Sequence, residues 1–482
     1  MKASTYGRWW QFVALLTLLS LVLAACGADT GQPGGSPAAS GAATTPAGGE
    51  GSPAASGAAT TPAGGEQGAA GNGPKLNKDV SGEITFWHFW GSPVRRNAIR
   101  RVIAICNQQL PNIKVSETFK PFGDIWTANI AAVAAGSGMP DVIVEDRPQL
   151  PQRARDQVDE NLQELAARDG IDGSAFWPFT WKQTLYEGNT YGIPYETDVR
   201  VLFWNKNAFK EAGLDPEKPP TTWEEVEQYA DKLDKKKEDG SYERIAFHPL
   251  IKAGTDTFGY TNGVNWISDD SKPQLNTPEA VETVEWVKKW VDRYSGWSEL
   301  QKFRGSFAAP PQDEFMSGRV AMVTDINGYT SQLDFYRPRL TNAEGKQEEL
   351  SWGVSFLPYS KERSSTSGGF ALSIPRGAPN KDAAWEFIKC ATSPEAQASW
   401  ARDTYAMPAN QAAAKDPVLL SDPRWQFFVE AMNHTSGGNY LPQYPNWKEQ
   451  LEQRYEKIWT GELEAKAALD EAQQAVEAQM KK

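Results

Sequence analysis

The sequence predicts an α/β protein built as two lobes, and three observations support this class. Residues 83–146 alternate strand-like and helix-like segments, which is typical of a parallel sheet flanked by helices. A second series of strand and helix patterns begins at residue 191 and continues beyond residue 320. The chain from about residue 75 to residue 482 is too long for one ordinary hydrophobic core, so two lobes are expected.

The N-terminal segment has the features of an exported lipoprotein. Lys2 and Arg8 are the only charged residues before Asp29, and an apolar run follows Arg8. Residues 23–26, Leu-Ala-Ala-Cys, match the bacterial lipobox, in which the cysteine, here Cys26, is acylated and becomes the first mature residue. A plain signal peptide with an incidental cysteine and an uncleaved signal anchor are the alternatives.

Residues 26–74 follow the predicted signal peptide (1–25) and are expected to form a tether behind the lipidated cysteine. They consist almost wholly of Gly, Ala, Ser, Thr and Pro, and the segment at 35–50 repeats letter for letter at 51–66. Without large apolar side chains, the entropy of ordering such a segment is not offset. A collagen-like fold is excluded because glycine does not recur at every third position. We interpret the segment as a flexible stalk that lifts a globular domain off a cell surface.

Composition excludes several classes of function. The formal net charge of −12 argues against nucleic acid as a partner. Three histidines, without a CxxC or HExxH motif, give no support for a metal site or a histidine triad, and no cofactor is expected. Cys106 and Cys390 lie on separate apolar helical stretches, where we expect small buried hydrophobic residues rather than a bridge; a bridge is the open alternative.

The first series of elements predicts a parallel sheet with its ligand edge near two short segments. The elements expected in order are a strand at 83–90, a helix at 93–109, a strand at 113–119, a helix at 124–135 and a strand at 141–146. Aromatic and β-branched residues mark the first strand, and Gly136 ends the second helix. Ligands gather at the carboxyl ends of such strands, which here are His88 to Ser92 and Glu145 to Arg147.

The second series predicts another set of strands and helices. The expected elements are a strand at 199–205, a short helix at 206–212, a helix at 277–294 and a strand at 319–325; the segments IAFHPL (245–250) and GGFALSIP (368–375) belong to the same series. Gly213 stops the short helix, and Thr222 with Glu225 forms a capping box that opens another helix. The last hundred residues are expected to be mostly amphipathic helices that pack against the lobes.

A co-linear set of motifs then identifies a family resemblance. The segments are ITFWHFWG, NIKVSETF, AAGSGMPDVIVED, YGIPYETDVRVLFWNKNAFKEAGLDPEKPPTTWEE, GRVAMVTDINGY, WGVSFLPYS, SGGFALSIPRGAPNKDAAWEFIKCATSPEAQ and YAMPAN. Together they resemble family 1 extracellular solute-binding proteins, the substrate receptors of carbohydrate ABC importers. The resemblance covers residues 83–470.

The resemblance implies a periplasmic-binding-protein-like fold of type II whose lobes close on ligand about a hinge. The chain would cross this hinge three times, near Glu196, Gly369 and Asn410. The implied partners are a carbohydrate or polyol ligand and the permease of an ABC importer, and the receptor would act as a lipid-anchored monomer on the outer face of the cell membrane. The implied lobes are 75–196 plus 369–411, and 197–368 plus 412–482.

The first lobe supplies polar candidates for the ligand site. Asp146 and Arg147 match in position the Asp-Arg pair that binds sugar hydroxyls in the maltose receptor, because a carboxylate and a guanidinium satisfy neighbouring hydroxyls. The alternative is an ion pair in an exposed loop. Glu196 lies where the family places a ligand-contacting acid. Tyr195 beside it would either stack on the ligand or pack within the hinge and hold it in place.

The second lobe and the hinge supply further candidates. Asn327 and Tyr329 occupy the place of the family's NGPW motif, whose aromatic ring stacks on sugar, although here Tyr replaces Pro-Trp. Phe258 and Trp266 are candidate platforms, with core packing as the alternative reading. The remaining candidates for ligand contact are Trp90, Gly368, Gly369, Phe370 and Arg402.

An exported enzyme and a surface adhesin are the two alternatives to a receptor. A glycosidase would need two suitably spaced carboxylates from the set Glu145, Asp146, Glu196 and Asp198. A surface adhesin would use the tether equally well but leaves the motif set unexplained. We therefore predict a binding protein and not an enzyme. The absence of an obvious Lys/Arg cluster among the candidates favours a neutral sugar.

Overall fold

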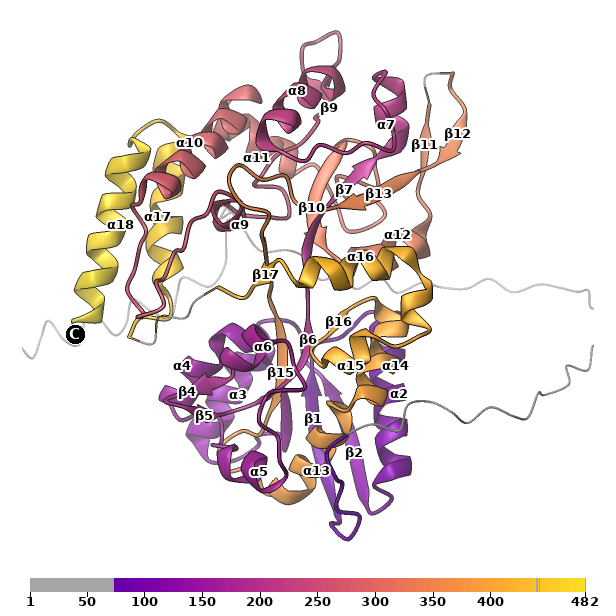
Figure 1. Cartoon of the computed structure of the whole chain (residues 1–482), viewed down its shortest axis with the longest axis vertical. Coiled ribbons are helices and arrows are strands. Elements are labelled where there is room, and N and C mark those ends of the chain that lie inside the picture. The colour runs from indigo at the N-terminus through magenta and orange to yellow at the C-terminus, as the bar shows by residue number, and fades with distance from the viewer. Residues whose placement is uncertain (1–72, 343, 439–440, 442, 482) are drawn as a thin grey trace, which may run out of the picture. The chain divides into compact units, whose positions relative to one another are not determined.

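The structure, a computed structural model, describes residues 73–342, 344–438, 441 and 443–481. The predicted signal peptide, the lipidation site at Cys26 and nearly all of the predicted tether lie outside these residues. The described residues belong to one compact unit, in which two lobes stand one above the other (Figure 1). Within the described ranges, no helix combines the length and the apolar character needed to cross a bilayer.

The first lobe is organised around a six-stranded sheet in the order β16-β6-β15-β3-β1-β2. Strand β1 pairs in parallel with both β2 and β3, as the alternation of strands and helices predicts. Later parts of the chain add β15, antiparallel to β3 and β6, and β16, antiparallel to β6. The strands are β1 (Gly82–His88), β2 (Ile113–Phe119), β3 (Val142–Asp146), β6 (Ile193–Thr197), β15 (Gly369–Ser373) and β16 (Met407–Pro408).

Helices cover this sheet on both faces. Ser92 caps the first of them, α2, by accepting a hydrogen bond from the Arg95 backbone N–H, and Pro93 fits the first helical turn. Helix α3 ends at Gly136, in the left-handed conformation, as expected. The elements of this lobe around the sheet are α2 (Pro93–Gln109), α3 (Asp124–Ala135), α4 (Leu150–Arg155), α5 (Gln163–Arg168), α6 (Pro178–Lys182), β4 (Leu185–Tyr186), β5 (Asn189–Thr190), α13 (Lys381–Ala391), α14 (Pro394–Thr404) and α15 (Gln411–Ala414).

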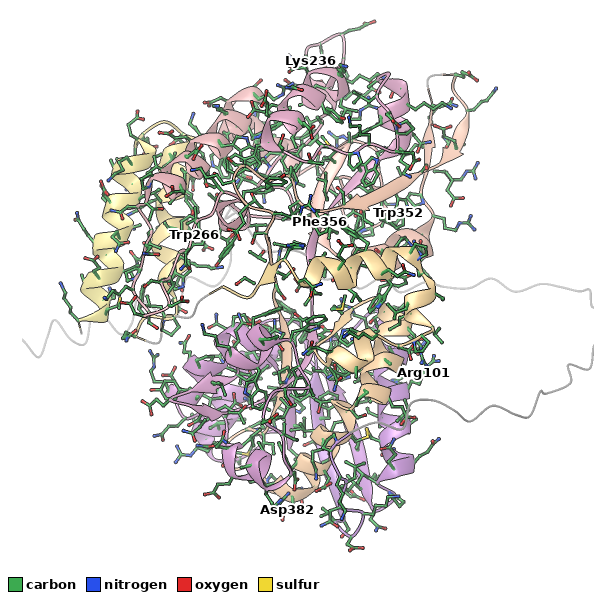
Figure 2. The ribbon with its side chains drawn as sticks, viewed as in Figure 1. Arg101, Lys236, Trp266, Trp352, Phe356 and Asp382 are labelled. Carbon is green, nitrogen blue, oxygen red and sulfur yellow. A yellow bond between two sulfur atoms is a disulfide. The ribbon has the colours of Figure 1, made fainter. Side chains whose placement is uncertain are left out.

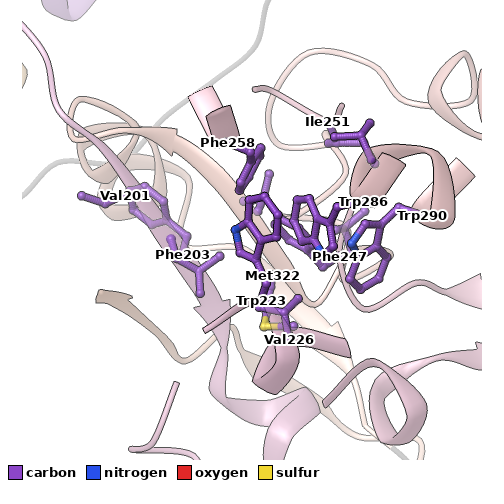
Figure 3. Close-up of a cluster of buried hydrophobic side chains, with 14 of the residues drawn as sticks. Val201, Phe203, Trp223, Val226, Phe247, Ile251, Phe258, Trp286, Trp290 and Met322 are labelled. Atoms are coloured by element: carbon purple, nitrogen blue, oxygen red, sulfur yellow. The ribbon is translucent and has the colours of Figure 1, made fainter. Parts of the chain in front are cut away.

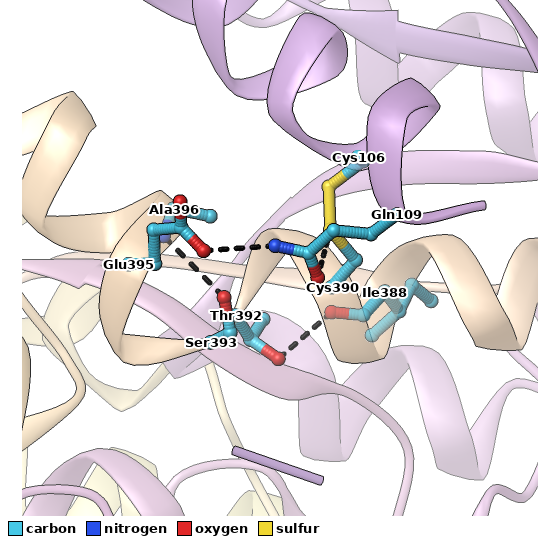
Figure 4. The surroundings of a disulfide bond; sticks show 8 residues. All are labelled: Cys106, Gln109, Ile388, Cys390, Thr392, Ser393, Glu395 and Ala396. Carbon is cyan, nitrogen blue, oxygen red and sulfur yellow. Dashed lines mark hydrogen bonds between the residues drawn. A yellow bond between two sulfur atoms is a disulfide. The ribbon is translucent and has the colours of Figure 1, made fainter. Parts of the chain in front are cut away.

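A disulfide joins Cys106 on α2 to Cys390 on α13, with their Cα atoms 5.7 Å apart (Figure 4). The preferred expectation of two unpaired buried cysteines is therefore wrong, although both residues are buried as expected. The pairing escaped local sequence reasoning because 284 positions separate the two cysteines, and only the packing of α2 against α13 brings them together. A disulfide also fits an exported protein.

The second lobe contains a three-stranded antiparallel sheet with β7 in the centre, between β10 and β13. The predicted capping box is present, since the Thr222 hydroxyl accepts from the Glu225 N–H at 3.2 Å. The segment IAFHPL at 245–250 forms no strand: Ile245 makes an isolated bridge to Val320, and Pro249, lacking an N–H, cannot extend a ladder. The strands of this lobe are β7 (Arg200–Asn205), β8 (Lys235–Lys236), β9 (Tyr242–Arg244), β10 (Met322–Ile326), β11 (Arg339–Thr341), β12 (Gln347–Glu349), β13 (Trp352–Ser355), β14 (Ser365–Thr366) and β17 (Thr435–Ser436).

Helices surround this second sheet, and the last two form the outer edge of the lobe in Figure 1. The helices are α7 (Lys206–Glu211), α8 (Trp223–Leu233), α9 (Thr255–Thr261), α10 (Pro278–Arg293), α11 (Trp297–Arg304), α12 (Tyr329–Tyr336), α16 (Pro423–Met432), α17 (Trp447–Trp459) and α18 (Ala465–Met480).

Aromatic side chains fill the core of the second lobe (Figure 3). Trp223 of α8 and Trp286 of α10 stack with ring centroids 4.1 Å apart, and Phe258 of α9 packs beside Trp286. Because β7 is covered on both sides, Val201, Leu202 and Phe203 are all fully buried. Most of the chain's many tryptophans thus serve packing, which leaves few for a ligand.

Three connections join the lobes: from β6 to β7, from β14 to β15, and from β16 toward α16. They lie close to the three crossings that the family resemblance implies. The exact lobe boundaries stay predictions.

Candidate functional site

A cavity of about 520 Å³ opens between the two lobes. This volume lies in the range of roughly 300–1,000 Å³ that small-molecule sites occupy. Both lobes line it, the first from the end of β3 and from the Gln183 region, the second from β7, α9, the β14 connection and the start of α17. The polar lining residues discussed below are Asp146, Gln149, Gln183, Arg200, Lys252, Asp256, Tyr260 and Lys448.

Asp146 provides the first lobe's charge at the cavity wall. It is the last residue of β3, at the carboxyl edge of the sheet, where the sequence predicts ligand contacts. Among the described residues, no group donates a hydrogen bond to its carboxylate. Burial raises the pKa of Asp146 to about 6, against the opposing influence of Arg147 and Arg153. The carboxylate is therefore an unpaired acceptor that titrates near neutral pH.

Arg147, predicted to contact ligand beside Asp146, is instead fully buried and holds the hinge. Its guanidinium donates to the backbone oxygen of Glu196 at 3.2 Å and to that of Gly368, so one side chain fastens two of the three crossings. It also donates to Gln183 Oε1 at 2.8 Å. Burial lowers the pKa of Arg147 to about 10, so the group stays charged at neutral pH. Arg147 thus positions the hinge and is not among the residues lining the cavity.

Gln183 extends this network to the second lobe. Its amide nitrogen donates to the backbone oxygen of Gly437 at 2.7 Å, across the inner end of the cavity. A Cβ at Gly437 would lie 2.4 Å from the Gln183 amide nitrogen, so a larger residue there would displace this side chain. Gln183 therefore connects Arg147 of the hinge with the opposite cavity wall.

The second lobe presents three cations to the cavity, and each is paired with acid. Arg200 lies 2.9 Å from Asp198, and Lys448 lies 2.6 Å from Asp256. Lys252 is 3.0 Å from Asp325 and also contacts two further carboxylates, those of Asp313 and Glu314. The wall is thus rich in hydrogen-bonding groups but carries no uncompensated positive charge among the described residues.

Two aromatic side chains line the same wall. Tyr260 of α9 and Trp447 of α17 face the cavity beside Lys448. Burial raises the pKa of Tyr260 to about 12, so its hydroxyl stays protonated and able to donate. The wall therefore combines aromatic rings with polar groups, the combination needed for a molecule with both hydroxyls and apolar C–H faces.

Of the residues that the sequence predicts for ligand contact, Asp146 and Gly368 line the cavity. Several others gather in the hinge. Glu196 accepts a hydrogen bond from the Trp400 indole at 2.7 Å, and Trp90 and Tyr195 pack in the same buried aromatic group. Asn327 accepts from the Val199 N–H at 3.1 Å, and Gly369 adopts a positive φ against the backbone of Glu196.

The remaining predicted residues lie in three other environments. Phe258 and Trp266 are fully buried in the second lobe, where Trp266 (labelled in Figure 2) donates to the backbone oxygen of Asp256 at 3.2 Å. Tyr329 is buried behind the cavity wall with its hydroxyl 2.6 Å from Asp313. Arg402 forms an exposed ion pair with Asp416, away from the cavity, and Phe370 is half-buried at the first lobe's edge.

Most of the second-lobe residues that line the cavity were not predicted from the sequence. On α9, Asp256, Thr257 and Tyr260 face the cavity while Phe258 points into the core, a division that helical spacing predicts once the helix is known. Trp447 and Lys448 belong to the C-terminal helices, which were interpreted as packing elements. Their sequence signal is only that they begin an amphipathic helix, which sequence alone does not connect to the cavity.

The four carboxylates considered for catalysis do not form a pair at the cavity. Glu145 is fully buried, and burial raises its pKa, with Asp159 adding to the rise. Glu196 is also buried, and Asp198 is paired with Arg200. Asp146 alone of the four lines the cavity. These four carboxylates therefore do not supply the acid and base of a glycosidase at the cavity.

A family model described as bacterial extracellular solute-binding protein matches residues 101–426, more than half of the chain. The chain belongs to this family. It is a solute-binding protein and not an enzyme. The two-lobed fold predicted from the sequence is confirmed.

Relatives and solved structures agree with this assignment. The sn-glycerol-3-phosphate-binding periplasmic protein UgpB of Shigella dysenteriae is 24% identical over 427 residues, covering 82% of this chain and 92% of the relative. A solved structure, CpMnBP1 with mannotriose bound, is 25% identical with a TM-score of 0.70, covering 83% of this chain and 99% of its own. An ABC transporter solute-binding protein from Thermotoga lettingae, solved with α-D-tagatose, is 25% identical with a TM-score of 0.67, covering 83% and 100% of the two chains.

Proposed function

We propose that this solute-binding protein captures a neutral sugar or polyol in the cavity between its lobes and delivers it to the permease of an ABC importer. The observation that carries the proposal is the charge arrangement of the cavity. One wall offers the unpaired carboxylate of Asp146, and the other offers cations whose charge is already compensated.

Sugar hydroxyls fit this arrangement chemically. An ionised carboxylate accepts two or more hydrogen bonds from neighbouring hydroxyls, and a carboxylate-paired Lys or Arg still has N–H groups left to donate. Tyr260 and Trp447 offer aromatic surface to the apolar C–H face of a sugar ring. Gln149 adds an amide that both donates and accepts.

The relatives support the same ligand class. CpMnBP1 binds mannotriose, and the Thermotoga lettingae ABC transporter protein binds tagatose. We assign the lobes as 75–196 plus 369–411 and 197–368 plus 412–482. Closure of these lobes on the sugar would bury it between both walls, and the bound sugar would favour the closed arrangement.

The proposal places the receptor on the extracellular side of the cell membrane. Acylation of Cys26 would anchor it, with residues 26–74 as a flexible tether, and the receptor would work as a monomer. Replacement of Cys26 by serine is expected to release the protein from membranes and to abolish incorporation of a labelled fatty acid. Equal labelling of the Cys26→Ser variant would show that the lipobox interpretation is wrong.

A phosphate ester is the second candidate, because three cations line the cavity and UgpB binds sn-glycerol 3-phosphate. A phosphate bound to the remaining N–H groups of Arg200, Lys252 or Lys448 would lie beside their carboxylate partners, whose negative charge repels it. The compensated charges therefore favour the neutral sugar.

One titration experiment separates these candidates. The sugar panel consists of mannose, mannobiose and mannotriose together with glucose, maltose and maltotriose, and glycerol 3-phosphate is titrated beside it. Calorimetry of the full-length protein is expected to show saturable binding of at least one panel sugar without turnover. Binding of glycerol 3-phosphate alone would favour the phosphate ester, and no binding across the panel would contradict the proposal.

A further inference from the structure

A buried polar cluster lies in the first lobe outside the cavity, and the proposed function gives it no role. We call Asn129, Glu145, Arg153, Asp159 and Ser373 the β3 cluster, after the strand that carries Glu145. The other members come from α3, from α4, from the segment between α4 and α5, and from β15. None of the five residues lines the cavity.

Strand pairing and hydrogen bonds bring the two carboxyl groups of the cluster to one face of the sheet. Ala371 of β15 lies opposite Glu145, and Ser373, two residues further along β15, emerges on the same face. The Ser373 hydroxyl donates to Asp159 Oδ1 at 2.9 Å, which holds Asp159 on that face. The Asn129 amide nitrogen donates to Glu145 Oε1 at 3.4 Å. Glu145 is fully buried and Asp159 is 3% exposed, so water has almost no access to either carboxyl group.

Each of these carboxyl groups keeps one oxygen without a hydrogen bond. Glu145 Oε2 and Asp159 Oδ2 accept none from any residue that the structure describes, and neither does the amide oxygen of Asn129. All three oxygen atoms are buried. A buried acceptor that lacks a donor costs free energy, so such atoms are rare in folded proteins. The β3 cluster therefore has more acceptors than its own donors satisfy.

Arg153 is the cation that faces both carboxyl groups. Its Nε lies 3.7 Å from Glu145 Oε2, and its side chain is 15% exposed. Its charge also acts on Asp159. Two ionised carboxylates against one guanidinium would leave an uncompensated negative charge inside the lobe, which is costly.

The surrounding charges do not supply the missing positive charge. Asp146, which follows Glu145 on β3, adds a negative charge. The cations on the neighbouring segments have partners elsewhere: Arg155 pairs with Asp156, Lys381 with Glu160, and Arg376 donates to Gln157. The β3 cluster thus lacks both one positive charge and one hydrogen-bond donor.

We propose that Glu145 and Asp159 form a proton-binding site that holds one proton at neutral pH. A proton on either carboxyl group leaves a single carboxylate, whose charge Arg153 balances. The O–H group that forms also supplies a donor for one of the unpaired oxygen atoms. Burial raises the pKa of both carboxyl groups, and the charge of Asp159 raises that of Glu145 further. The proposal does not depend on which ligand binds in the cavity.

A metal ion is the other occupant that unpaired oxygen atoms attract. Within the ranges that the structure describes, no group of three His, Cys, Asp or Glu side chains is placed to hold one. The guanidinium of Arg153 would also repel a cation beside Glu145. A proton needs no shell of ligands, so the geometry favours the proton.

The bound proton makes the stability of the protein depend on pH. A carboxyl group with a raised folded-state pKa binds its proton more tightly in the folded state. Its contribution to stability is full below the unfolded-state pKa and is lost as pH rises through the folded-state pKa. For Asp159 this interval runs from about 4 in the unfolded chain to about 7 in the folded protein. The cluster should therefore stabilise the protein at pH 5 and lose this effect by pH 8.

Infrared spectra of the ligand-free, full-length protein at pH 7 count the bound protons directly, because a protonated carboxyl group has its own carbonyl band. Glu145→Gln and Asp159→Asn are each expected to lose the band intensity of one carboxyl group. The double variant should lose no more than either single variant, because the pair holds one proton. A loss of two carboxyl groups in the double variant, or no loss in any variant, would overturn the proposal.

Melting temperatures at pH 5 and pH 8 give a second readout. The wild-type value is expected to fall by about 2 °C or more beyond the fall of either single variant, because only the wild type loses the proton. Glu145→Gln should melt above the wild type at pH 8, since its amide N–H₂ donates where the O–H group did. Equal falls for the wild type and both single variants would contradict the proposal.

Glu386→Gln is the matched control, because Glu386 is a buried carboxyl group of the same lobe, 2% exposed, that already has Lys389 as partner at 2.9 Å. It should keep the wild-type carbonyl band and the wild-type difference between pH 5 and pH 8. A wild-type melting temperature that rises with calcium chloride, together with a carbonyl band equal to that of both single variants, would replace the proton by a bound cation and overturn the proposal. No outcome involves a sugar, so the proposed function is tested separately.

Discussion

Lys448 Nζ lies 2.6 Å from Asp256 Oδ2 on the second lobe's wall of the cavity. We expect this pair to influence which ligands the wall accepts, because the carboxylate compensates a cation that would otherwise attract an anion. The Trp266 indole N–H also donates a hydrogen bond to the backbone oxygen of Asp256, which helps to hold Asp256 in position.

Asp256→Asn is expected to free Lys448 and to change the preference of the cavity. The Lys448 ammonium, no longer paired, should give the cavity measurable affinity for glycerol 3-phosphate. It can form a charge-assisted hydrogen bond to the phosphate in place of the one to Asp256. Affinity for the panel sugar should change by less than about 1 kcal/mol, since a paired cation contributes little net charge. Calorimetric titration with both ligands measures this, and Asp292→Asn, which breaks the surface pair with Lys288, is the control.

Asp146→Asn is expected to weaken sugar binding by roughly 1–3 kcal/mol at pH 7.5, the cost of a lost charged acceptor in a partly buried site. Because the pKa of Asp146 is raised to about 6, the wild-type affinity should fall as pH drops from 7.5 to 5, while the variant's affinity stays flat. Titrations across this pH range measure both trends. A wild-type affinity that does not depend on pH would argue against Asp146 as the acceptor.

The same substitution is expected to stabilise the ligand-free protein. A carboxyl whose folded-state pKa is raised binds its proton more tightly in the folded state, so its contribution to stability declines as pH rises through the interval from about 4 to about 6. Asp146→Asn should therefore have the higher melting temperature at pH 7.5, and the difference should shrink toward pH 4. Calorimetric melting curves at both pH values are the measurement.

Arg147→Met is expected to destabilise the hinge by on the order of 3 kcal/mol, because buried acceptors on Gln183, Glu196 and Gly368 each lose a charged donor. Urea denaturation of the ligand-free protein measures the loss. Arg402→Met removes an exposed ion pair instead and should cost less than about 1 kcal/mol. Equal costs for the two variants would show that Arg147 does not fasten the crossings.

Reduction of the Cys106–Cys390 disulfide is expected to lower the free energy of unfolding by about 2–5 kcal/mol, because it releases a closed loop of 284 residues in the unfolded chain. Sugar affinity should stay unchanged, since neither cysteine lines the cavity. Urea denaturation with and without dithiothreitol tests this. The Cys106→Ala, Cys390→Ala double variant should not respond to the reductant.

Much of the fold could be predicted from the sequence because its signals are local. The alternation of strands and helices at 83–146, the glycine after α3 and the Thr222 capping box each depend on residues within a few positions, and the structure has all three. The disulfide was missed because its partners meet only through helix packing.

The candidate site was less predictable because it depends on the direction of each side chain. The position of Asp146 at the cavity could be predicted because ligands bind at the carboxyl ends of the strands in most sheets of this type. Its neighbour Arg147 turns inward to the hinge, and on α9 one residue step separates the buried Phe258 from positions that line the cavity. Trp447 and Lys448 reach the cavity from the C-terminal helices, a long-range contact that no local pattern indicates.

Small-angle X-ray scattering of the compact unit, residues 70–482, tests whether the two lobes close on a bound sugar. We propose that the sugar is then held between Asp146 on one wall and Lys448 on the other. We expect a smaller radius of gyration at a saturating concentration of the panel sugar than without it. Asp146→Asn is expected to show no such change at the same sugar concentration if that concentration lies below the variant's dissociation constant. A scattering profile of the wild type that is identical with and without saturating sugar would contradict capture between closing lobes.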